Sequence, residues 1–114
     1  IPMVPWYIGI SDFEEISTPT MIIGCENDTI APVAFHSIPF YNDIPNSTNK
    51  AYLEINNGSH LCVAGFIGGD VLGKYAVSWM KRFIDSDTRY DQFLCGPNHQ
   101  SDYTVSDYRD NCDD

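Results

Sequence analysis

A short apolar run and an alternating segment, each followed by polar loop residues, limit the folds open to this 114-residue chain. The run 19–24 (PTMIIG) lies between proline and glycine, and the run 51–55 (AYLEI) ends in the turn sequence NNGS, so both are typical of strands. Between them, 31–44 has helical spacing of its apolar residues, which we expect Pro39 to break or kink. The order of these elements favours an α/β fold.

The longest periodic segment, 71–85, predicts an amphipathic helix. We expect Asp70 to cap its N-terminus. The residues expected to share its apolar face are Leu72, Ala76, Trp79, Met80 and Phe83. The segment from Gly96 onward is polar, and we expect a bridge between Cys95 and Cys112 alone to hold it.

Alternating strands and helices predict a parallel sheet with right-handed crossovers and helices on its faces. Two strands cannot bury such a sheet on both sides. Alone, they would leave a long open edge and an apolar helix face exposed. We therefore expect the chain to complete a larger sheet.

The charge of the chain excludes some partners. Sixteen acidic residues against six basic ones give a formal net charge of −10. Such a surface argues against nucleic acid and against an anionic membrane as partners. No run approaches the ~18 apolar residues that a membrane span needs. The first residues include neither a basic leader region nor a methionine at position 1, so we expect a mature or excised piece of a protein.

Four cysteines, an even number, predict disulfides and an oxidising compartment. Four cysteines allow three pairings. The short-range pairing joins Cys25 to Cys62 and Cys95 to Cys112. No C-x-x-C spacing occurs, which argues against a zinc or thioredoxin-type site.

An aspartate and a histidine each follow one of the two predicted strands. Asp28 comes after the first and His60 after the second. Reactive groups in open α/β sheets gather beyond the carboxyl ends of strands, so Asp28 could orient the His60 imidazole toward a nucleophile. A Cys25–Cys62 bridge would tie the same two loops together. Alternatively, Asp28 caps a turn and His60 bonds only to backbone.

The other two histidines lie outside this arrangement. His36 lies in the apolar stretch VAFHSIPFY, where a structural role is expected. His99 lies in the polar tail, where we expect it to be solvated.

Three stretches carry a resemblance to a known family: TMIIGCENDTIAPV (20–33), AYLEINNGSHLC (51–62) and GKYAVSWMKRFIDSDTRYDQFLC (73–95). Together they resemble the C-terminal part of bacterial cutinases and polyester hydrolases, which include poly(ethylene terephthalate) (PET) hydrolases. The similarity runs from about Pro5 to Cys112. It implies a three-layer α/β-hydrolase with a mostly parallel sheet, of which residues 1–114 form the C-terminal part. The two cysteine pairs resemble a subgroup with an extra bridge beside the active site.

The resemblance also implies roles for single residues. Asp28 would be the acid of a Ser-His-Asp triad and His60 its general base. Trp6 matches an aromatic residue that flanks the ester-binding cleft, and Ile30 matches an apolar wall of it. Leu61 stands where relatives carry phenylalanine or serine.

Relatives that bind calcium use acidic residues near these loops. Glu26 partly fits that pattern, but Asn56 stands where an acid would be needed. No metal site and no cofactor are therefore predicted.

The nucleophile is missing from the sequence, because no G-x-S-x-G elbow occurs in the 114 residues. In α/β-hydrolases the serine precedes the acid and the histidine along the chain, so we expect it in an N-terminal portion of the same hydrolase. The expected function is hydrolysis of polyesters such as cutin or PET by a secreted enzyme, with this chain inactive alone. The alternatives are a short-chain esterase or lipase with the same triad, and a secreted, disulfide-stapled fragment that binds a partner without catalysis.

Overall fold

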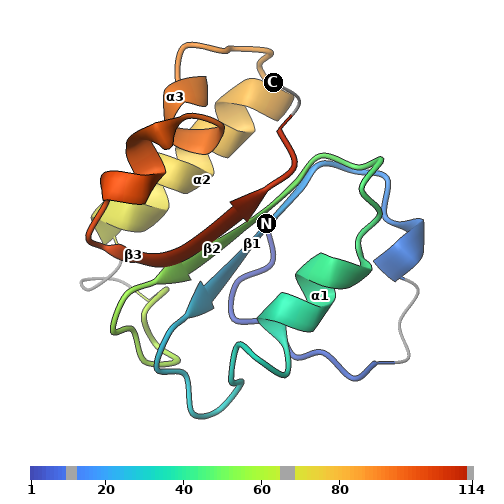
Figure 1. The fold of residues 1–114 in the computed structure, drawn as a ribbon, viewed down its shortest axis with the longest axis vertical. Helices are drawn as coiled ribbons and strands as arrows, with labels where there is room; N and C mark the ends of the chain where they lie inside the picture. The colour runs from blue at the N-terminus through green and yellow to red at the C-terminus, as the bar shows by residue number, and fades with distance from the viewer. Residues whose placement is uncertain (10–12, 65–68, 113–114) are drawn as a thin grey trace.

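The computed structural model describes residues 1–9, 13–64 and 69–112, which form an α/β unit around a three-stranded sheet (Figure 1). The strands are β1 (Thr20–Cys25), β2 (Lys50–Ile55) and β3 (Val105–Asp110), in the order β1-β2-β3. As predicted, β1 and β2 are parallel, with Cys25 opposite Ile55. β3 runs antiparallel to β2, so the sheet is mixed.

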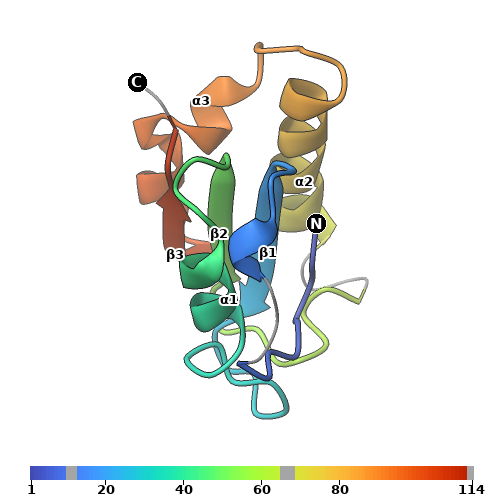
Figure 2. The same ribbon diagram turned by 90° about the vertical axis from the view of Figure 1, so that its right-hand side faces the viewer.

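Helices cover both faces of the sheet and make three layers. Helix α1 (Ser37–Asp43) lies on one face, toward the viewer in Figure 2, and α2 (Gly69–Phe83) lies on the other with α3 (Asp91–Leu94) beside it. Strands β1 and β2 are buried along their whole length. Burial on both faces explains the near-continuous apolar sequence of β1. In β2 the two charged residues are also buried: Lys50 Nζ donates to the Tyr41 and Ile44 carbonyls, and Glu54 accepts the Tyr52 hydroxyl. The main buried contacts on the α1 side come from Ile22, Phe40, Tyr41, Ile44 and Tyr52.

Helix α1 is shorter than the predicted segment, and Pro39 neither breaks nor kinks it. The helix begins at Ser37, so Pro39 is its third residue. The first N–H groups of a helix have no partner within it, so a proline there loses no hydrogen bond. The 3₁₀ turn η1 (Phe13–Glu15) packs beside α1, where Phe13 stacks on Phe40 with ring centroids 4.0 Å apart.

Helix α2 confirms the predicted amphipathic helix but corrects two details. Asp70 lies inside its first turn and not at the cap. Its buried residues are Val71, Tyr75, Ser78 and Trp79, whereas Met80 is 47% exposed. The buried face is therefore displaced toward Tyr75 from the predicted one, because it follows the sheet surface that the helix must cover.

The prediction for the C-terminal segment is wrong. Residues Pro97–Ser101 form a 3₁₀ turn, η2, and Val105–Asp110 form the edge strand β3. Val105 and Tyr108 pack against the core beneath α2. The alternating charged residues of an edge strand hide it in the sequence. His99 is also not solvated, since its half-buried ring packs against Tyr108, with centroids 4.2 Å apart and the ring planes tilted by 31°.

Asn111 fastens the end of this segment to the start of β2. Its Nδ2 donates to the carbonyl oxygens of Asn46 (3.0 Å) and Thr48 (2.7 Å), and its Oδ1 accepts the N–H of Lys50 at 2.7 Å. The segment is therefore held by strand pairing and by a side-chain clamp, in addition to its disulfide.

Both disulfides of the short-range pairing are present. Cys25 and Cys62 have Cα atoms 6.1 Å apart, and Cys95 and Cys112 have theirs 5.6 Å apart. The first joins the end of β1 to the loop after β2, and the second joins α3 to the end of β3. None of the described helices has the length and apolar character needed to cross a lipid bilayer.

Candidate active site

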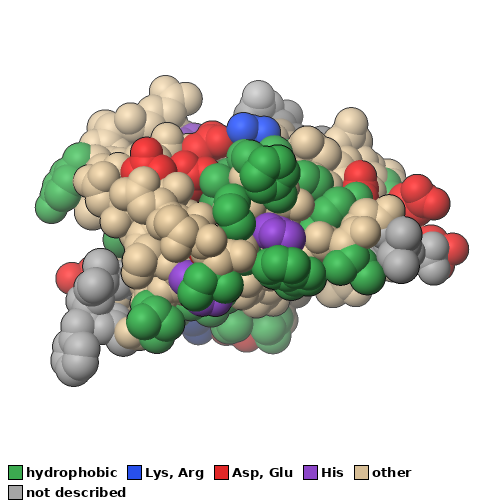
Figure 3. Space-filling view, turned by 90° about the horizontal axis from the view of Figure 1, so that it is seen from below, with side chains coloured by type: hydrophobic (Ala, Val, Ile, Leu, Met, Phe, Trp, Pro, Cys, Tyr) green, Lys and Arg blue, Asp and Glu red, His purple; other side chains and the backbone are tan. Residues whose placement is uncertain are grey.

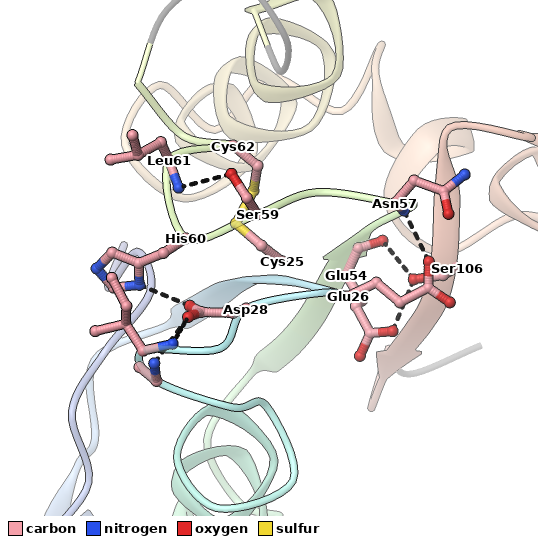
Figure 4. Close-up of a disulfide and its surroundings, with 12 residues drawn as sticks. Cys25, Glu26, Asp28, Glu54, Asn57, Ser59, His60, Leu61, Cys62 and Ser106 are labelled. Atoms are coloured by element: carbon pink, nitrogen blue, oxygen red, sulfur yellow. Dashed lines mark hydrogen bonds and ion pairs between the residues drawn. A yellow bond between two sulfur atoms is a disulfide. The ribbon is translucent and has the colours of Figure 1, made fainter.

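Asp28 and His60 meet at the edge where β1 and β2 end (Figure 4). The Nδ1 atom of His60 lies 2.7 Å from Oδ2 of Asp28. The Asp28 side chain is 1% exposed and that of His60 is 28% exposed. The two loops thus bring an acid and an imidazole into direct contact, with the imidazole toward solvent.

Asp28 also caps the turn that carries it. Its Oδ1 accepts the N–H groups of Ile30 (2.9 Å) and Ala31 (2.7 Å), while Oδ2 faces His60. Burial would raise the pKa of this carboxyl, but the hydrogen bonds from Ala31, His60 and Ile30 outweigh it and hold the pKa below its usual value. The turn-capping and pairing roles therefore coexist in one carboxylate.

The ionised Asp28 sets the tautomer of His60. A carboxylate can only accept hydrogen bonds, so Nδ1 of a neutral His60 must carry the hydrogen that it donates. This leaves the lone pair of Nε2 free on the side away from Asp28 (Figure 4). An imidazole held this way can take a proton from a hydroxyl placed at Nε2.

The Cys25–Cys62 disulfide joins the two loops that carry Asp28 and His60. Cys25 precedes Asp28 by three residues and Cys62 follows His60 by two, and both are buried. Turn hydrogen bonds run from the Asp28 N–H to the Cys25 carbonyl (3.1 Å) and from the Cys62 N–H to the Ser59 carbonyl (2.8 Å). Each loop is therefore held at its cysteine, and the disulfide joins the two cysteines covalently.

Exposed hydrophobic side chains come from the same end of the molecule, where Figure 3 shows histidine and hydrophobic side chains next to one another. Ile30 follows Asp28 by two residues and Leu61 follows His60 directly, and both are more than 60% exposed. Trp6, 65% exposed, comes from the N-terminal segment and stacks on His36 with ring centroids 4.1 Å apart. Two of the three predicted cleft residues thus share the loops of the Asp–His pair.

His36 supports Trp6, a contact that sequence reasoning missed. The ring is buried, and its Nδ1 accepts the N–H of Tyr7 at 2.9 Å. Sequence reasoning assigned His36 a structural role from its apolar neighbours, and burial confirms that role. The stacking partner lies 30 positions away in an irregular segment, which no local pattern indicates.

Glu26 and Asn56, considered above for calcium, make other contacts. Glu26 Oε2 accepts the N–H of Asn57 at 2.7 Å, and Asn56 Nδ2 donates to the Tyr103 carbonyl at 3.0 Å. Over residues 1–9, 13–64 and 69–112, no three His, Cys, Asp or Glu side chains cluster in a way that could hold a metal ion.

The sequence matches the model of a known family, described as PET hydrolase-like, over residues 1–113. The chain belongs to this PET hydrolase-like family. The family resemblance found in the sequence is thereby confirmed.

The relatives of this PET hydrolase-like chain include a bis(hydroxyethyl) terephthalate hydrolase and several cutinases. It is 49% identical over 112 residues to the bis(hydroxyethyl) terephthalate hydrolase of Streptomyces coelicolor. It is 52% identical over 113 residues to cutinase est1 of Thermobifida alba and 48% identical to a cutinase of Thermobifida fusca. Each match covers 98% of this chain but only 35–37% of the relative, so the chain spans little more than a third of their length.

Proposed function

We propose that this chain supplies the acid and the general base of a serine ester hydrolase that acts on polyesters. The observation that carries the proposal is the 2.7 Å contact between His60 Nδ1 and Asp28 Oδ2, in a chain of the PET hydrolase-like family. The names of its relatives, cutinases and a bis(hydroxyethyl) terephthalate hydrolase, favour carboxylic esters of polymers and their fragments as substrates.

The proposed reaction is a two-step acyl transfer. His60 Nε2 takes the proton of a serine hydroxyl while the serine oxygen attacks the ester carbonyl. The imidazolium, stabilised by ionised Asp28, gives that proton to the departing alcohol, which leaves an acyl-serine. Water then attacks the acyl group and loses a proton to His60. The bond between the acyl carbon and the serine oxygen breaks, His60 returns the proton to that oxygen, and the carboxylic acid leaves.

The serine and the oxyanion-hole donors would come from an N-terminal portion of the same α/β-hydrolase. No nucleophile elbow occurs in these 114 residues, and the relatives are nearly three times longer. We therefore propose that the chain alone does not hydrolyse esters.

The outer edge of β1 is one place where the N-terminal portion could pair with this chain. Residues 2–4 already lie along it as a parallel segment: Pro2 O accepts the N–H of Ile23 at 3.0 Å, and Val4 N donates to Ile23 O at 2.8 Å. Among residues 1–9, 13–64 and 69–112 this contact is an isolated bridge at Met3, so these residues pair with β1 on this side over only a fraction of its length. A strand of the complementary portion would extend the sheet here.

Helix α2 offers a second contact beside that edge. Val77, Met80 and Ile84, spaced to fall on one side of the helix and its C-terminal extension, are 52%, 47% and 74% exposed. A pocket of about 210 Å³ next to them is lined by Ile1, Pro19, Trp79, Met80, Phe83 and Ile84, among others. Apolar side chains in this arrangement are expected to be buried by the same complementary portion.

The residues proposed to contact the ester are Trp6, Ile30 and Leu61, all exposed. These three side chains form the proposed apolar rim of the ester site, and such a rim favours aromatic or long-chain polyester over small soluble esters. The short-chain esterase or lipase alternative uses the same triad and differs only in this rim. The disulfide that links the two loops and the second disulfide favour an extracellular enzyme.

A chimera tests the proposal. Residues 1–114 would replace the segment that they match in cutinase est1 of Thermobifida alba, so that the rest of that longer protein supplies the N-terminal portion. We expect the chimera to hydrolyse p-nitrophenyl butyrate and polyester film, the H60A chimera to hydrolyse neither, and the free chain to be inactive. A folded chimera without esterase activity would refute the proposal. A chimera active on soluble esters but inert on film would favour the short-chain esterase.

A further inference from the structure

The loops that carry Asp28 and His60 stay paired beyond the ends of their strands. Glu26 N donates to the Ile55 carbonyl at 3.0 Å, and Asn27 N donates to the Gly58 carbonyl at 2.8 Å. The first bond continues the parallel ladder past its last register pair, and the second joins the two loops directly. The catalytic residues proposed above follow one and two positions after this extension.

A side chain from one loop holds a strained turn in the other. Glu26 reaches across from the β1 loop, and its Oε2 accepts the N–H of Asn57 at 2.7 Å (Figure 4). Asn57 has a φ of 56°, in the left-handed region that asparagine enters more readily than most residues. A hydrogen bond to an ionised acceptor is about twice as strong as a neutral one, so the carboxylate favours this conformation.

The backbone of the next residue, Gly58, is packed closely against the disulfide. A Cβ at Gly58 would lie 2.6 Å from Cys62 Cβ and 3.3 Å from Cys25 Cβ, so the backbone passes directly over the disulfide. The turn at Asn57 sets the direction in which the chain leaves β2. The disulfide fixes the far end of the loop at Cys62. His60 lies between these two anchors.

We propose that Glu26 is a positioning residue: by holding Asn57 in its left-handed conformation, it fixes the segment that presents His60 to Asp28. This inference rests on the proposed function only in taking the Asp28–His60 pair as the catalytic one. Glu26 itself touches neither member of the pair in the hydrogen-bond network. It acts through the backbone of Asn57 and Gly58.

The test reads the Asp28–His60 hydrogen bond directly in the 114-residue chain. In ¹⁵N-histidine-labelled protein at low temperature, the Nδ1–H proton of His60 gives a downfield resonance whose exchange rate with water is measured, and D28N assigns it. We expect E26A to speed this exchange at least tenfold and to expose the Asn57 amide to exchange. E26Q keeps an oxygen acceptor at the same reach but loses the charge, so its rates should lie between those of wild type and E26A.

Two further variants complete the series. E26D shortens the side chain by one methylene and should behave as E26A. Where E26A does not fold, the comparison of E26D with E26Q still tests whether the reach of the side chain matters. E15A removes an exposed glutamate of η1 and should change neither rate. A His60 exchange rate within twofold of wild type in both E26A and E26D, or in E26D alone where E26A does not fold, would overturn the inference.

The outcomes also separate this inference from the proposed function. A wild-type chain without a protected His60 Nδ1–H would contradict the Asp–His pair itself. A protected resonance that depends on Glu26, together with an inactive chimera, would leave the positioning role standing and remove the enzymatic one.

Discussion

The indole of Trp6 lies stacked on the imidazole of His36, with 4.1 Å between ring centroids and an interplanar angle of 29°. Trp6 is largely exposed, whereas His36 is buried, so the histidine offers the indole a fixed surface to rest on. The stack links the irregular N-terminal segment to the start of α1.

His36→Ala should therefore free Trp6. In a W79F background, where Trp6 is the remaining tryptophan, we expect faster nanosecond depolarisation of its fluorescence. The Tyr7 N–H also loses its acceptor, which should cost about 1–3 kcal/mol of unfolding free energy. His99→Ala is the control: it removes a histidine that packs against Tyr108 and not against Trp6, so it should leave the Trp6 signal unchanged. Equal Trp6 mobility in both variants would contradict this role of His36.

Removing either disulfide should destabilise the chain by similar amounts but with different effects on the site. The cysteines are 37 positions apart in Cys25–Cys62 and 17 apart in Cys95–Cys112, for which loop closure predicts a loss of roughly 3–4 kcal/mol each. Urea unfolding of the two double Cys→Ala variants measures this loss. Only C25A/C62A should speed exchange of the His60 Nδ1–H. The same acceleration in C95A/C112A would show that the nearer bridge has no special role.

Acid should weaken the contact between α2 and the C-terminal segment through Asp102. Its carboxylate accepts hydrogen bonds from Lys74 Nζ (3.1 Å), Tyr75 OH (2.8 Å) and Thr104 N (3.0 Å). Burial opposes ionisation, but the bonds from Thr104, Tyr75 and Lys74 outweigh it and lower the pKa of Asp102 to about 2, against an unperturbed 3.8. A carboxylate whose pKa is lower in the folded state stabilises the fold fully at pH values above its unfolded-state pKa. That stabilisation is lost as the pH falls through the folded-state pKa.

The stability difference between wild type and D102N measures this effect. We expect a charge-dependent part on the order of 2 kcal/mol at neutral pH, which should diminish as pH falls from about 4 to 2. Urea unfolding at several pH values follows it. A difference that stays constant over this range would mean that Asp102 contributes through shape alone.

Two glycines should respond to alanine in opposite directions. A Cβ at Gly24 would lie 2.9 Å from Val33 Cγ1 and 3.1 Å from both Ser37 Oγ and Tyr52 OH, so G24A should cost about 1–3 kcal/mol by pushing α1 off the sheet. A Cβ at Gly73, within α2, meets nothing within 4 Å, so G73A should stabilise by about 0.5–1 kcal/mol. Thermal unfolding compares them, and destabilisation by G73A would contradict the open space at that position.

Sequence reasoning found the elements whose signals are local. The run 19–24 became β1 (Thr20–Cys25), because a strand buried on both faces favours unbroken apolar sequence, and the segment 51–55 became β2 (Lys50–Ile55), which its alternating pattern and the following turn sequence had indicated. Parallel pairing of these strands then brought Asp28 and His60 to one edge, as predicted from their positions after the strands.

Features that depend on distant partners could not be read from the sequence. β3 carries Asp107, Arg109 and Asp110 on an edge, and only Val105 and Tyr108 reveal its buried side. The buried face of α2 depends on the sheet that it covers. The Trp6–His36 stack and the Glu26–Asn57 bond join residues about 30 positions apart, so no local spacing announces them.

The most direct test of the central claim is the turnover of the D28N chimera. Asparagine cannot hold the His60 tautomer that an ionised aspartate selects, and in serine hydrolases this loss reduces kcat by about 10⁴-fold. We predict a loss of this order toward p-nitrophenyl butyrate, with cooperative unfolding retained. A folded D28N chimera that keeps its kcat within about tenfold of the unmodified chimera, a difference of only ~1.4 kcal/mol in the barrier, would contradict the assignment of Asp28 and His60 as the acid and base.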